Sequence, residues 1–374
     1  MKILLAPDKF KGTLDAAKVC LAMDEALRES GHKLDITSVP MADGGEGTCD
    51  MLTEFSKGRK ITFPVLDPFF RTIEGWYGIS GDGQTAFIEM AVASGLQLIK
   101  PDERNALLGT TYGTGELIAD ALQRGVSSII LGVGGSGTND GGIGMGEALG
   151  ARFLDSAKKP LKPIGQNLAL IRSVDLSNLH PRAREVSVTA ICDVSNPLYG
   201  ENGAAHVFGP QKGASHQDVE FLDNGLRNFA DVIKRQMGID LNFPGAGAGG
   251  GLGGGAKIFF NIAFCSGIEF IINFIGLPDL VKNSDLVFTG EGKMDEQTLS
   301  GKVVKGVADL ARRYDKRVIV IVGKNELSVV KINLLGVHKV ITLVDSKTPE
   351  QESFEKTFEL IKKRIREEVI PFFL

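Results

Sequence analysis

The sequence has few cysteines and few histidines, which limits the metal and redox chemistry it can carry. Its four cysteines are far apart and form no C-x-x-C pair, which argues against a disulfide framework and against a zinc site of that kind. The five histidines are isolated in the sequence, so we expect them to be surface or packing residues. Scattered free thiols predict a reducing compartment, and we expect a cytoplasmic location.

Neither a strong positive charge nor a long uninterrupted apolar run is present. The formal net charge is -4, so the basic field that holds a nucleic-acid backbone is missing. The apolar start, residues 1–6, meets Pro7 and is too short for a signal peptide. Polar residues interrupt residues 258–276, which we interpret as two buried helices. We therefore expect neither nucleic acid nor membrane as a partner.

Several well-known catalytic motifs are missing too. The sequence has no G-x-x-x-x-G-K-[ST] phosphate loop, no protein-kinase motif set, and neither H-E-x-x-H nor G-x-S-x-G. The pattern Gly132-x-Gly134-x-x-Gly137 fits a dinucleotide-binding loop, but the predicted helix begins several residues too late. An NAD-dependent hydroxy-acid dehydrogenase remains an alternative on this motif alone.

Length and periodicity predict two α/β domains. A chain of 374 residues, 43% of them hydrophobic, exceeds the size at which one core usually stops growing. Strand and helix patterns alternate at both ends of the chain, and neither end alone makes a sheet of typical width. We expect one parallel sheet built from both termini, residues 1–60 and 281–374, with an inserted second domain, residues 61–280.

Glycine is abundant, with 47 residues gathered in clusters. Five segments combine glycines, carboxylates and hydroxyls beside the end of a predicted strand, where α/β sheets bind ligands. They are residues 6–12, 41–47, 132–142, 192–197 and 289–298, and a sixth glycine cluster spans residues 245–255. Backbone N–H groups of residues 132–142 and 245–255 suit an anion.

Together these loops offer what phosphoryl transfer needs: phosphate donors, carboxylates for a divalent cation, cationic side chains and a proton acceptor. Plain structural roles remain open beside this one. Asp140 fits a helix N-cap, Asp43 and Glu46 fit a turn and a first helical turn, and Asp193 fits a turn cap.

Seven ordered segments resemble the bacterial glycerate kinases that lack a phosphate loop of the G-K-[ST] type. The segments are residues 6–12, 42–48, 132–142, 192–198, 207–213, 245–249 and 289–292. The resemblance implies a flavodoxin-like parallel sheet from both termini and an inserted α/β domain with a mixed sheet. It also implies Mg²⁺-dependent transfer from ATP to a hydroxyl of D-glycerate, giving 2-phosphoglycerate, in a cleft between the domains.

With glycerate as substrate, we predict Asp193 as the proton acceptor and Lys9 and Lys11 as the cations of the reaction. Asp193, Glu291 and Asp295 are the candidate metal ligands. The remaining candidate substrate or nucleotide contacts are Asp8, Asp43, Gly44, Gly45, Glu46, Arg71, Ser136, Thr138, Asn139, Asp140, Asn196, Gly247, Gly249, Glu291, Lys293 and Ser300.

Other interpretations stay open. Lys9 and Lys11 also fit solvated surface lysines, and Ser300 and Lys302 fit a plain helix start. A non-enzymatic regulator that binds a sugar acid is a further alternative. The sequence leaves the oligomeric state open, with a homodimer as one option.

Overall fold

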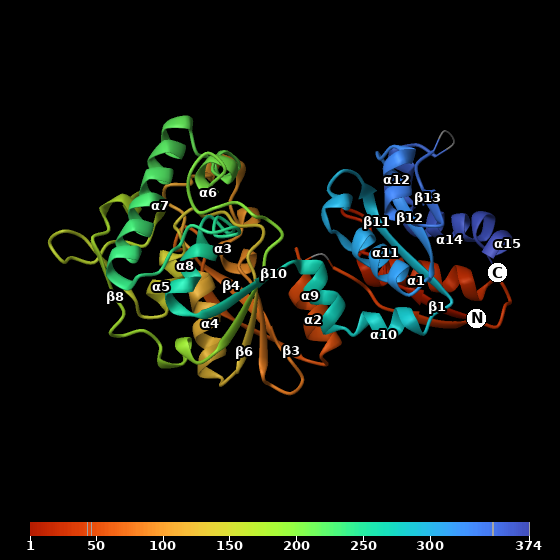
Figure 1. The fold of residues 1–374 in the computed structure, drawn as a ribbon, viewed down its shortest axis with the longest axis horizontal. Helices are drawn as coiled ribbons and strands as arrows, with labels where there is room; N and C mark the ends of the chain where they lie inside the picture. Colours follow the sequence, from red (N-terminus) through yellow and green to blue (C-terminus); the bar gives the residue numbers. More distant parts are fainter. Residues whose placement is uncertain (43, 46, 346–347, 374) are drawn as a thin grey trace. The chain divides into compact units, whose positions relative to one another are not determined.

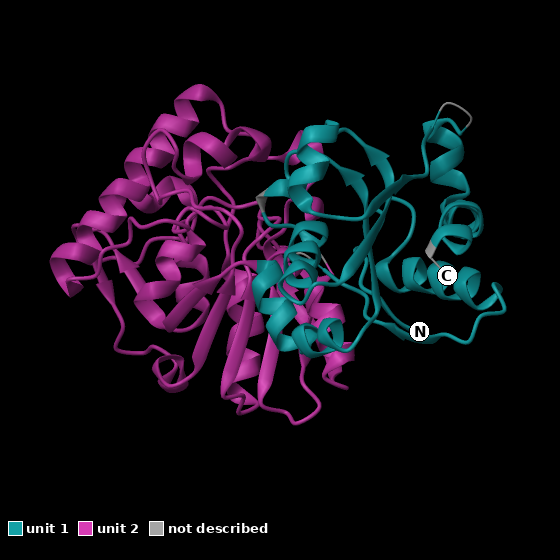
Figure 2. Cartoon of the chain, turned by 45° about the vertical axis from the view of Figure 1, so that its right-hand side comes forward, with its two compact units in different colours: residues 1–43, 267–374 teal, residues 44–266 magenta. Residues whose placement is uncertain are grey.

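The computed structural model describes residues 1–42, 44–45, 47–345 and 348–373. It divides into two compact units, residues 1–43 with 267–374 (unit 1) and residues 44–266 (unit 2) (Figure 2). The domain boundaries expected from the sequence, 60/61 and 280/281, stay a prediction. The units divide earlier at both places because helix α2, Thr48–Phe55, contacts the sheet of unit 2 while α9, Gly267–Phe274, contacts helices of unit 1.

Unit 1 contains a five-stranded parallel sheet in the order β13-β12-β11-β1-β2 (Figure 1). Its strands are β1 Lys2–Leu5, β2 Asp35–Ser38, β11 Leu286–Met294, β12 Arg317–Asn325 and β13 Lys339–Thr342. Its helices are α1 Ala16–Arg28, α9, α10 Leu277–Lys282, α11 Val303–Arg313, α12 Val329–Leu335, α13 Glu350–Glu355, α14 Thr357–Glu368 and α15 Ile370–Phe373. This is the doubly wound 2-1-3-4-5 order of flavodoxin-like sheets, which confirms the predicted fold of this part.

Local chemistry explains several of these elements. Asp15 caps α1 by accepting a hydrogen bond from the Lys18 N–H at 2.7 Å. β11 and β12 are buried on both faces in the sheet interior, as their nearly continuous apolar residues predict. The expected strand 286–289 is too short: β11 continues to Met294, which pairs with Asn325 of β12.

Unit 2 contains a six-stranded mixed sheet in the order β10-β9-β6-β5-β4-β3, in which β3 and β4 are the antiparallel part. Its strands are β3 Arg59–Leu66, β4 Thr72–Ile79, β5 Thr85–Glu89, β6 Ser128–Gly132, β9 Ser187–Ile191 and β10 Asn261–Cys265, with a separate pair β7 Arg152–Leu154 and β8 Ser173–Asp175. Its helices are α2, α3 Ala91–Ser94, α4 Tyr112–Gln123, α5 Ile143–Ala148, α6 Ala204–Phe208, α7 His216–Met237 and α8 Leu252–Phe259. The predicted mixed sheet is confirmed.

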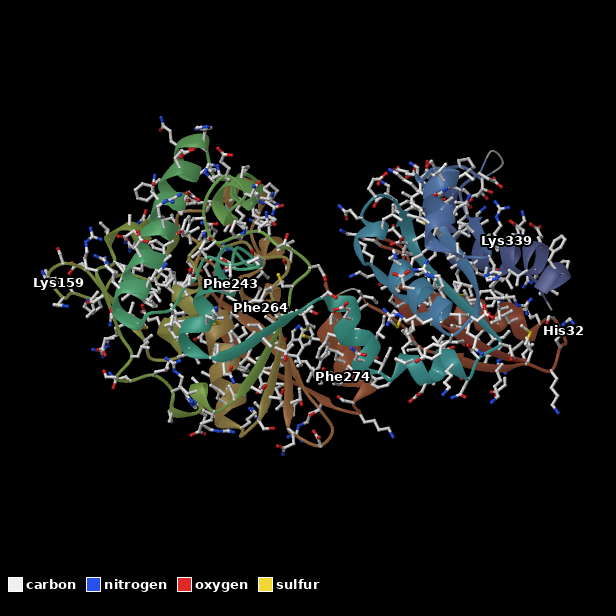
Figure 3. The ribbon with its side chains drawn as sticks, viewed as in Figure 1. His32, Lys159, Phe243, Phe264, Phe274 and Lys339 are labelled. Carbon is white, nitrogen blue, oxygen red and sulfur yellow. The ribbon has the colours of Figure 1, made fainter. Side chains whose placement is uncertain are left out.

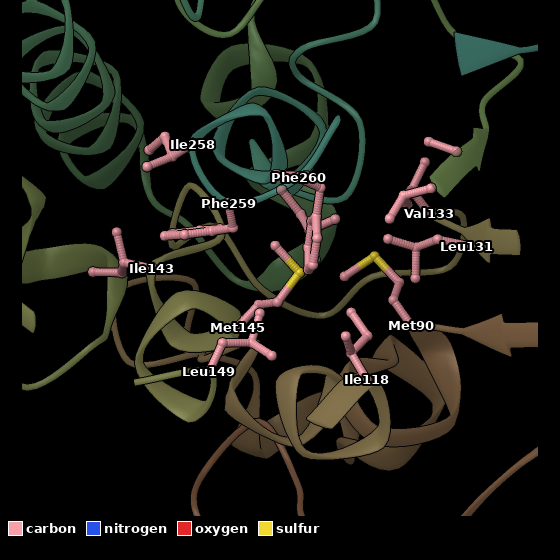
Figure 4. Close-up of a cluster of buried hydrophobic side chains, with 14 of the residues drawn as sticks. Met90, Ile118, Leu131, Val133, Ile143, Met145, Leu149, Ile258, Phe259 and Phe260 are labelled. Carbon is pink, nitrogen blue, oxygen red and sulfur yellow. The ribbon is translucent and has the colours of Figure 1, made fainter. Parts of the chain in front are cut away.

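The core of unit 2 joins helices from distant parts of the chain. Met145 and Leu149 of the α5 region lie in the same buried cluster as Phe259 and Phe260 of the α8 region (Figure 4). The longest helix, α7, begins at a capping box formed by Ser215 and Asp218. This packing fixes the glycine-rich loops that precede α5 and α8.

The expectation of two buried helices over residues 258–276 is wrong. Between α8 and α9 lies strand β10, which pairs with β9 in parallel. Phe264 of β10 packs edge-on against Phe243 at 5.3 Å between ring centroids (Figure 3). No helix in the described part of the chain is both long enough and apolar enough to cross a bilayer.

Candidate active site

In unit 1 the predicted site residues gather where β1 and β11 end. On leaving β1 the chain turns to β2 on one side, while β11 lies on the other, so this is the switch point at which flavodoxin-like sheets bind ligands. Asp8 follows β1, and its backbone N–H donates to the Gly290 carbonyl at 2.8 Å. The structure therefore places residues 8–11 beside the second half of β11.

A close backbone approach holds these two segments together. A Cβ added to Gly292 would lie 3.0 Å from the Lys11 nitrogen and 3.2 Å from the Phe10 Cα. Any larger residue at this position would force the two backbones slightly apart. Lys9 is half-buried and Lys11 is exposed, and the Lys9 N–H donates to the Asp8 carboxylate at 2.7 Å.

Glu291 is a buried carboxylate of this region. It lies on β11 itself, 5% exposed, and accepts a hydrogen bond from the Thr298 hydroxyl at 2.6 Å. The pKa of Glu291 is raised to about 7, mainly by burial; the Thr298 hydroxyl and Lys302 act to lower it, and the charges of Asp8 and Asp295 act to raise it. A buried carboxylate with like-charged neighbours at a strand end is typical of functional sites.

The other predicted residues of unit 1 lie around this carboxylate. The Lys293 ammonium is 2.8 Å from Glu326 and 3.6 Å from Asp295, so two carboxylates engage it. Ser300 ends a short 3-10 helix, Thr298–Ser300, and Lys302 directly precedes α11. The structure thus places Asp8 and Asp295 near enough to Glu291 for their charges to act on its pKa.

In unit 2 the parallel strands β5, β6 and β9 end at one edge of the sheet. The loop 132–142 follows β6, and Asp193 and Asn196 follow β9, which is paired with β6 through Gly132 and Ile191. Asp193 is exposed. Asn196 is half-buried, and its carbonyl accepts hydrogen bonds from the N–H groups of Gly245 and Gly247. The edge therefore carries the sequence-predicted loops of this unit.

Asp140 is fully buried beneath this edge. Its carboxylate accepts hydrogen bonds from the Thr111 N–H, the Thr111 hydroxyl and the N–H groups of Gly142 and Gly144, at 2.8 to 3.1 Å. Burial raises the pKa of Asp140, and these hydrogen bonds act to lower it. Both oxygens are engaged inside the protein, although the N-cap of α5 is Gly142 and not Asp140; a ligand contact of Asp140 stays a prediction.

Glycines let residues 245–255 pack tightly against the loop 132–142. Cβ atoms added to Gly250 and Gly255 would lie 1.9 Å from the Thr138 carbonyl oxygen and 2.0 Å from that of Gly141. Gly247 and Gly249 are buried in the same way, against Pro197 and Met90. Residues 245–251 thus pack against the loop 132–142 and support it. The ligand contacts predicted for Gly247 and Gly249 stay predictions.

Arg71 lies at the tip of the β3–β4 hairpin. Its guanidinium donates to Asp67 at 2.6 Å and to Glu103 at 3.0 Å. A cavity of about 340 Å³ is adjacent; it is lined by Phe69, Phe70, Glu103, Asn105, Leu108 and Lys162. Two carboxylates thus engage this cation.

The start of α2 holds the last of the predicted loops. Gly44 has a φ of +90°, and the Gly45 carbonyl accepts from the Thr48 N–H at 3.2 Å. The predicted contacts Asp43 and Glu46 lie outside the residues that the structure describes.

Two residues that sequence reasoning missed are buried at the same edge of unit 2. Glu89, the last residue of β5, accepts hydrogen bonds from the N–H groups of Gly47 and Cys49 at the α2 N-terminus. Lys212 is 1% exposed, and its amine donates to the Ser136 hydroxyl and the Thr138 carbonyl. For Glu89 the available signal was a carboxylate at the end of an apolar strand. For Lys212 it was the position of this lysine in the segment 207–213, one of the seven segments that carry the family resemblance.

Comparisons with known proteins agree on one family. The family model described as "Glycerate kinase family" matches residues 3–371. A glycerate kinase of Haemophilus influenzae is 46% identical over 324 residues, 86% of each chain, and a glycerate 2-kinase of Escherichia coli is 41% identical over 367 residues, 98% of this chain and 96% of that one. A crystal structure described as glycerate kinase 2 of Salmonella typhimurium LT2 matches with a TM-score of 0.88 at 40% identity, covering 98% of this chain and 96% of that one.

The chain therefore belongs to the glycerate kinase family. Membership makes it an ATP-dependent kinase, an enzyme, and decides against both the dehydrogenase and the regulator as alternatives.

Proposed function

We propose that this kinase transfers the γ-phosphoryl group of ATP to the 2-hydroxyl of D-glycerate in a Mg²⁺-dependent reaction. The observation that carries the proposal is the 41% identity, over 98% of the chain, to a relative named glycerate 2-kinase. The matched region, 98% of this chain, covers the loops at both sheet edges, so the substrate and the position of the phosphate are proposed from the relative.

Glycerate is an anion, and we assign the binding of its carboxylate to the loop after β1. Lys9 and Lys11 lie at the switch point of unit 1, where a carboxylate ligand is expected. An ammonium is a flexible point charge, suited to hold a carboxylate while the hydroxyl reacts. We assign Lys293, another cation of this region, to charge compensation because Asp295 and Glu326 already engage it.

Asp193 is the proposed proton acceptor. It is exposed, follows a parallel strand and lies in the segment 192–197, which has neither helix nor strand, so a hydroxyl can approach its carboxylate. A positioned carboxylate that takes the hydroxyl proton commonly contributes about 10² to 10⁴ in rate. The backbone N–H groups of exposed Gly134 and Gly135 are the proposed donors to phosphate oxygens.

Magnesium fits the donor set of unit 1. Among the described residues no group of three histidine, cysteine or carboxylate side chains is arranged to hold a metal ion by itself, but Mg²⁺ is commonly held by one or two carboxylates plus substrate phosphates. Asp8, Glu291 and Asp295 supply hard oxygen donors, and the raised pKa of Glu291 reflects burial among negative charges that a cation would offset. Bound there, Mg²⁺ would neutralise charge on the transferring phosphate; Asp193 remains a proposed alternative ligand.

The test is an ADP-release assay with D-glycerate, L-glycerate and other small hydroxy acids, with Mg²⁺ or with EDTA, and phosphorus NMR of the product. We expect turnover with D-glycerate, loss of turnover in EDTA that added Mg²⁺ restores, and a 2-phosphate signal. Turnover confined to another hydroxy acid would reject the substrate, and a 3-phosphate signal would reject the proposed position.

A further inference from the structure

Lys212 is a buried lysine for which the proposed function has no role so far. It ends the 3-10 helix Pro210–Lys212, and Gly213 follows with a φ of +89°. A Cβ on Gly213 would lie 2.4 Å from the Arg104 carbonyl oxygen, and the Arg104 guanidinium donates to the Gln211 carbonyl at 3.3 Å. Packing against Arg104 thus holds this segment and directs Lys212 inward.

The amine of Lys212 joins two points of the loop 132–142. It donates to the Ser136 hydroxyl at 2.8 Å and to the Thr138 carbonyl at 2.6 Å, across 76 and 74 residues of sequence. Gly250 packs closely against the same carbonyl, because a Cβ added to Gly250 would lie 1.9 Å from the Thr138 oxygen. The Thr138 peptide is therefore held by a hydrogen bond and by close packing together.

A lysine is an unfavourable choice for a position that needs only packing. Lysines are almost never fully buried unless they are paired, and methionine would fill a similar volume without an amine to desolvate. Burial lowers the pKa of Lys212 to about 7, against the raising effect of Asp140. Keeping an amine here makes sense if its hydrogen bonds to the loop are needed.

The loop carries further polar atoms that the protein itself leaves unsatisfied. In the described part of the chain, the Thr138 hydroxyl and both amide atoms of Asn139 are buried without a hydrogen-bond partner. Buried polar atoms in native proteins are nearly always satisfied, by ordered water or a ligand where the protein does not do so. Together with the exposed Gly134 and Gly135, they mark residues 134–139 as a segment built for polar ligands.

We infer that Lys212 is a positioning residue of the proposed phosphoryl transfer, whose amine fixes Ser136 and the Thr138 peptide so that residues 134–139 keep the conformation that receives the anionic ligand. The inference rests on the proposed function for its catalytic part. Its structural part, the hold on the loop, can be tested without any turnover.

The experiment compares the wild type with K212M, which removes the donors, and with K212Q, whose amide keeps two N–H donors. The matched control is K362M, a second lysine of low exposure, which pairs with Glu25 and Glu29 on α1 and its C-cap. We expect K212M to lower kcat by about 10², more than it raises either KM, because misplacement of about 1 Å can have that effect. K212Q should lose about tenfold, and K362M less than twofold.

Hydrogen exchange of the backbone amides in residues 132–142 is the second measurement. We expect faster exchange there in K212M, an intermediate rate in K212Q and the wild-type rate in K362M. If K212M does not fold, K212Q and K362M decide by the same two measurements. A folded variant at Lys212 with unchanged exchange in residues 132–142 overturns the inference, and so does one with altered exchange but kcat within threefold of the wild type. Absence of glycerate phosphorylation in the wild type rejects the proposed function instead, and the exchange data still test the hold on the loop.

Discussion

The carboxylate of Asp140 accepts two hydrogen bonds from Thr111, one from its N–H and one from its hydroxyl, both at 2.8 Å. The Thr111 hydroxyl also accepts from the Met145 N–H at 2.9 Å. Thr111 directly precedes α4 and Met145 lies in α5, so one buried carboxylate joins two helix starts to the loop 132–142.

We predict that Thr111→Val destabilises the protein although valine has nearly the same shape. The substitution leaves the buried Met145 N–H without its acceptor and removes one donor from Asp140. The expected loss is about 1–3 kcal/mol of unfolding free energy. Urea denaturation measures it, with Thr357→Val as the control, since that buried hydroxyl donates to the Ser353 carbonyl of a helix region. Equal losses in the two variants would contradict the prediction.

Glycine at position 255 should tolerate no side chain. Its added Cβ would lie 2.0 Å from the Gly141 carbonyl oxygen, so Gly255→Ala must displace α8 or the loop 132–142. Overpacking of this kind costs about 1–3 kcal/mol. Gly134→Ala is the control because nothing lies within 4 Å of its Cβ position. Thermal unfolding should show a lower Tm for Gly255→Ala and almost no change in Tm for Gly134→Ala. A larger loss of Tm in Gly134→Ala than in Gly255→Ala would reject the packing argument.

The stability of unit 2 should depend on pH through Lys212. Its folded pKa of about 7 lies below the ordinary value of 10.5, so folding disfavours the charged amine. The loss of unfolding free energy that results is complete below pH 7. As pH rises from 7 towards 10.5, the unfolding free energy increases by up to about 1.4 kcal/mol per pH unit. Urea midpoints of the wild type should therefore rise relative to K212M between pH 7 and pH 9. Parallel pH curves for the two proteins would show that Lys212 is charged in the folded state.

Asp193→Asn should abolish most turnover while the fold is retained. The expected loss in kcat is about 10² to 10⁴, because the amide cannot accept the hydroxyl proton. Asp231→Asn, an exposed carboxylate on α7, is the control and should keep wild-type rates. Circular dichroism establishes that both variants are folded. Near-normal kcat in Asp193→Asn would reject the proposed proton acceptor and leave the family membership untouched.

The sequence predicts the architecture well where patterns are local. Apolar runs next to turn residues predict β1, β6 and β9, and strands at both ends predict the split parallel sheet. β10 was missed because a short apolar run does not distinguish a strand from a buried helix. The extension of β11 to Met294 was missed because pairing with β12, a tertiary contact, determines it.

The candidate site is predictable in its loops and less so in its buried supports. Glycine and carboxylate patterns predicted residues 6–12, 132–142 and 192–197, and the structure places each at the end of a parallel strand. Lys212 was missed because a lysine in a glycine-rich segment is usually solvated. Its burial depends on the packing of Gly213 against Arg104, which no local pattern reports.

The central pair of the unit 1 sheet sets an order for folding during synthesis. Ile3 of β1 pairs with Leu286 of β11, and the whole of unit 2 is translated between them. At typical elongation rates of about 5–20 residues per second, the first strand waits for its neighbour for tens of seconds. Unit 2 is continuous in sequence and can fold in that interval. During it β2 can already pair with one edge of β1, while the edge that will face β11 stays unpaired until β11 is synthesised.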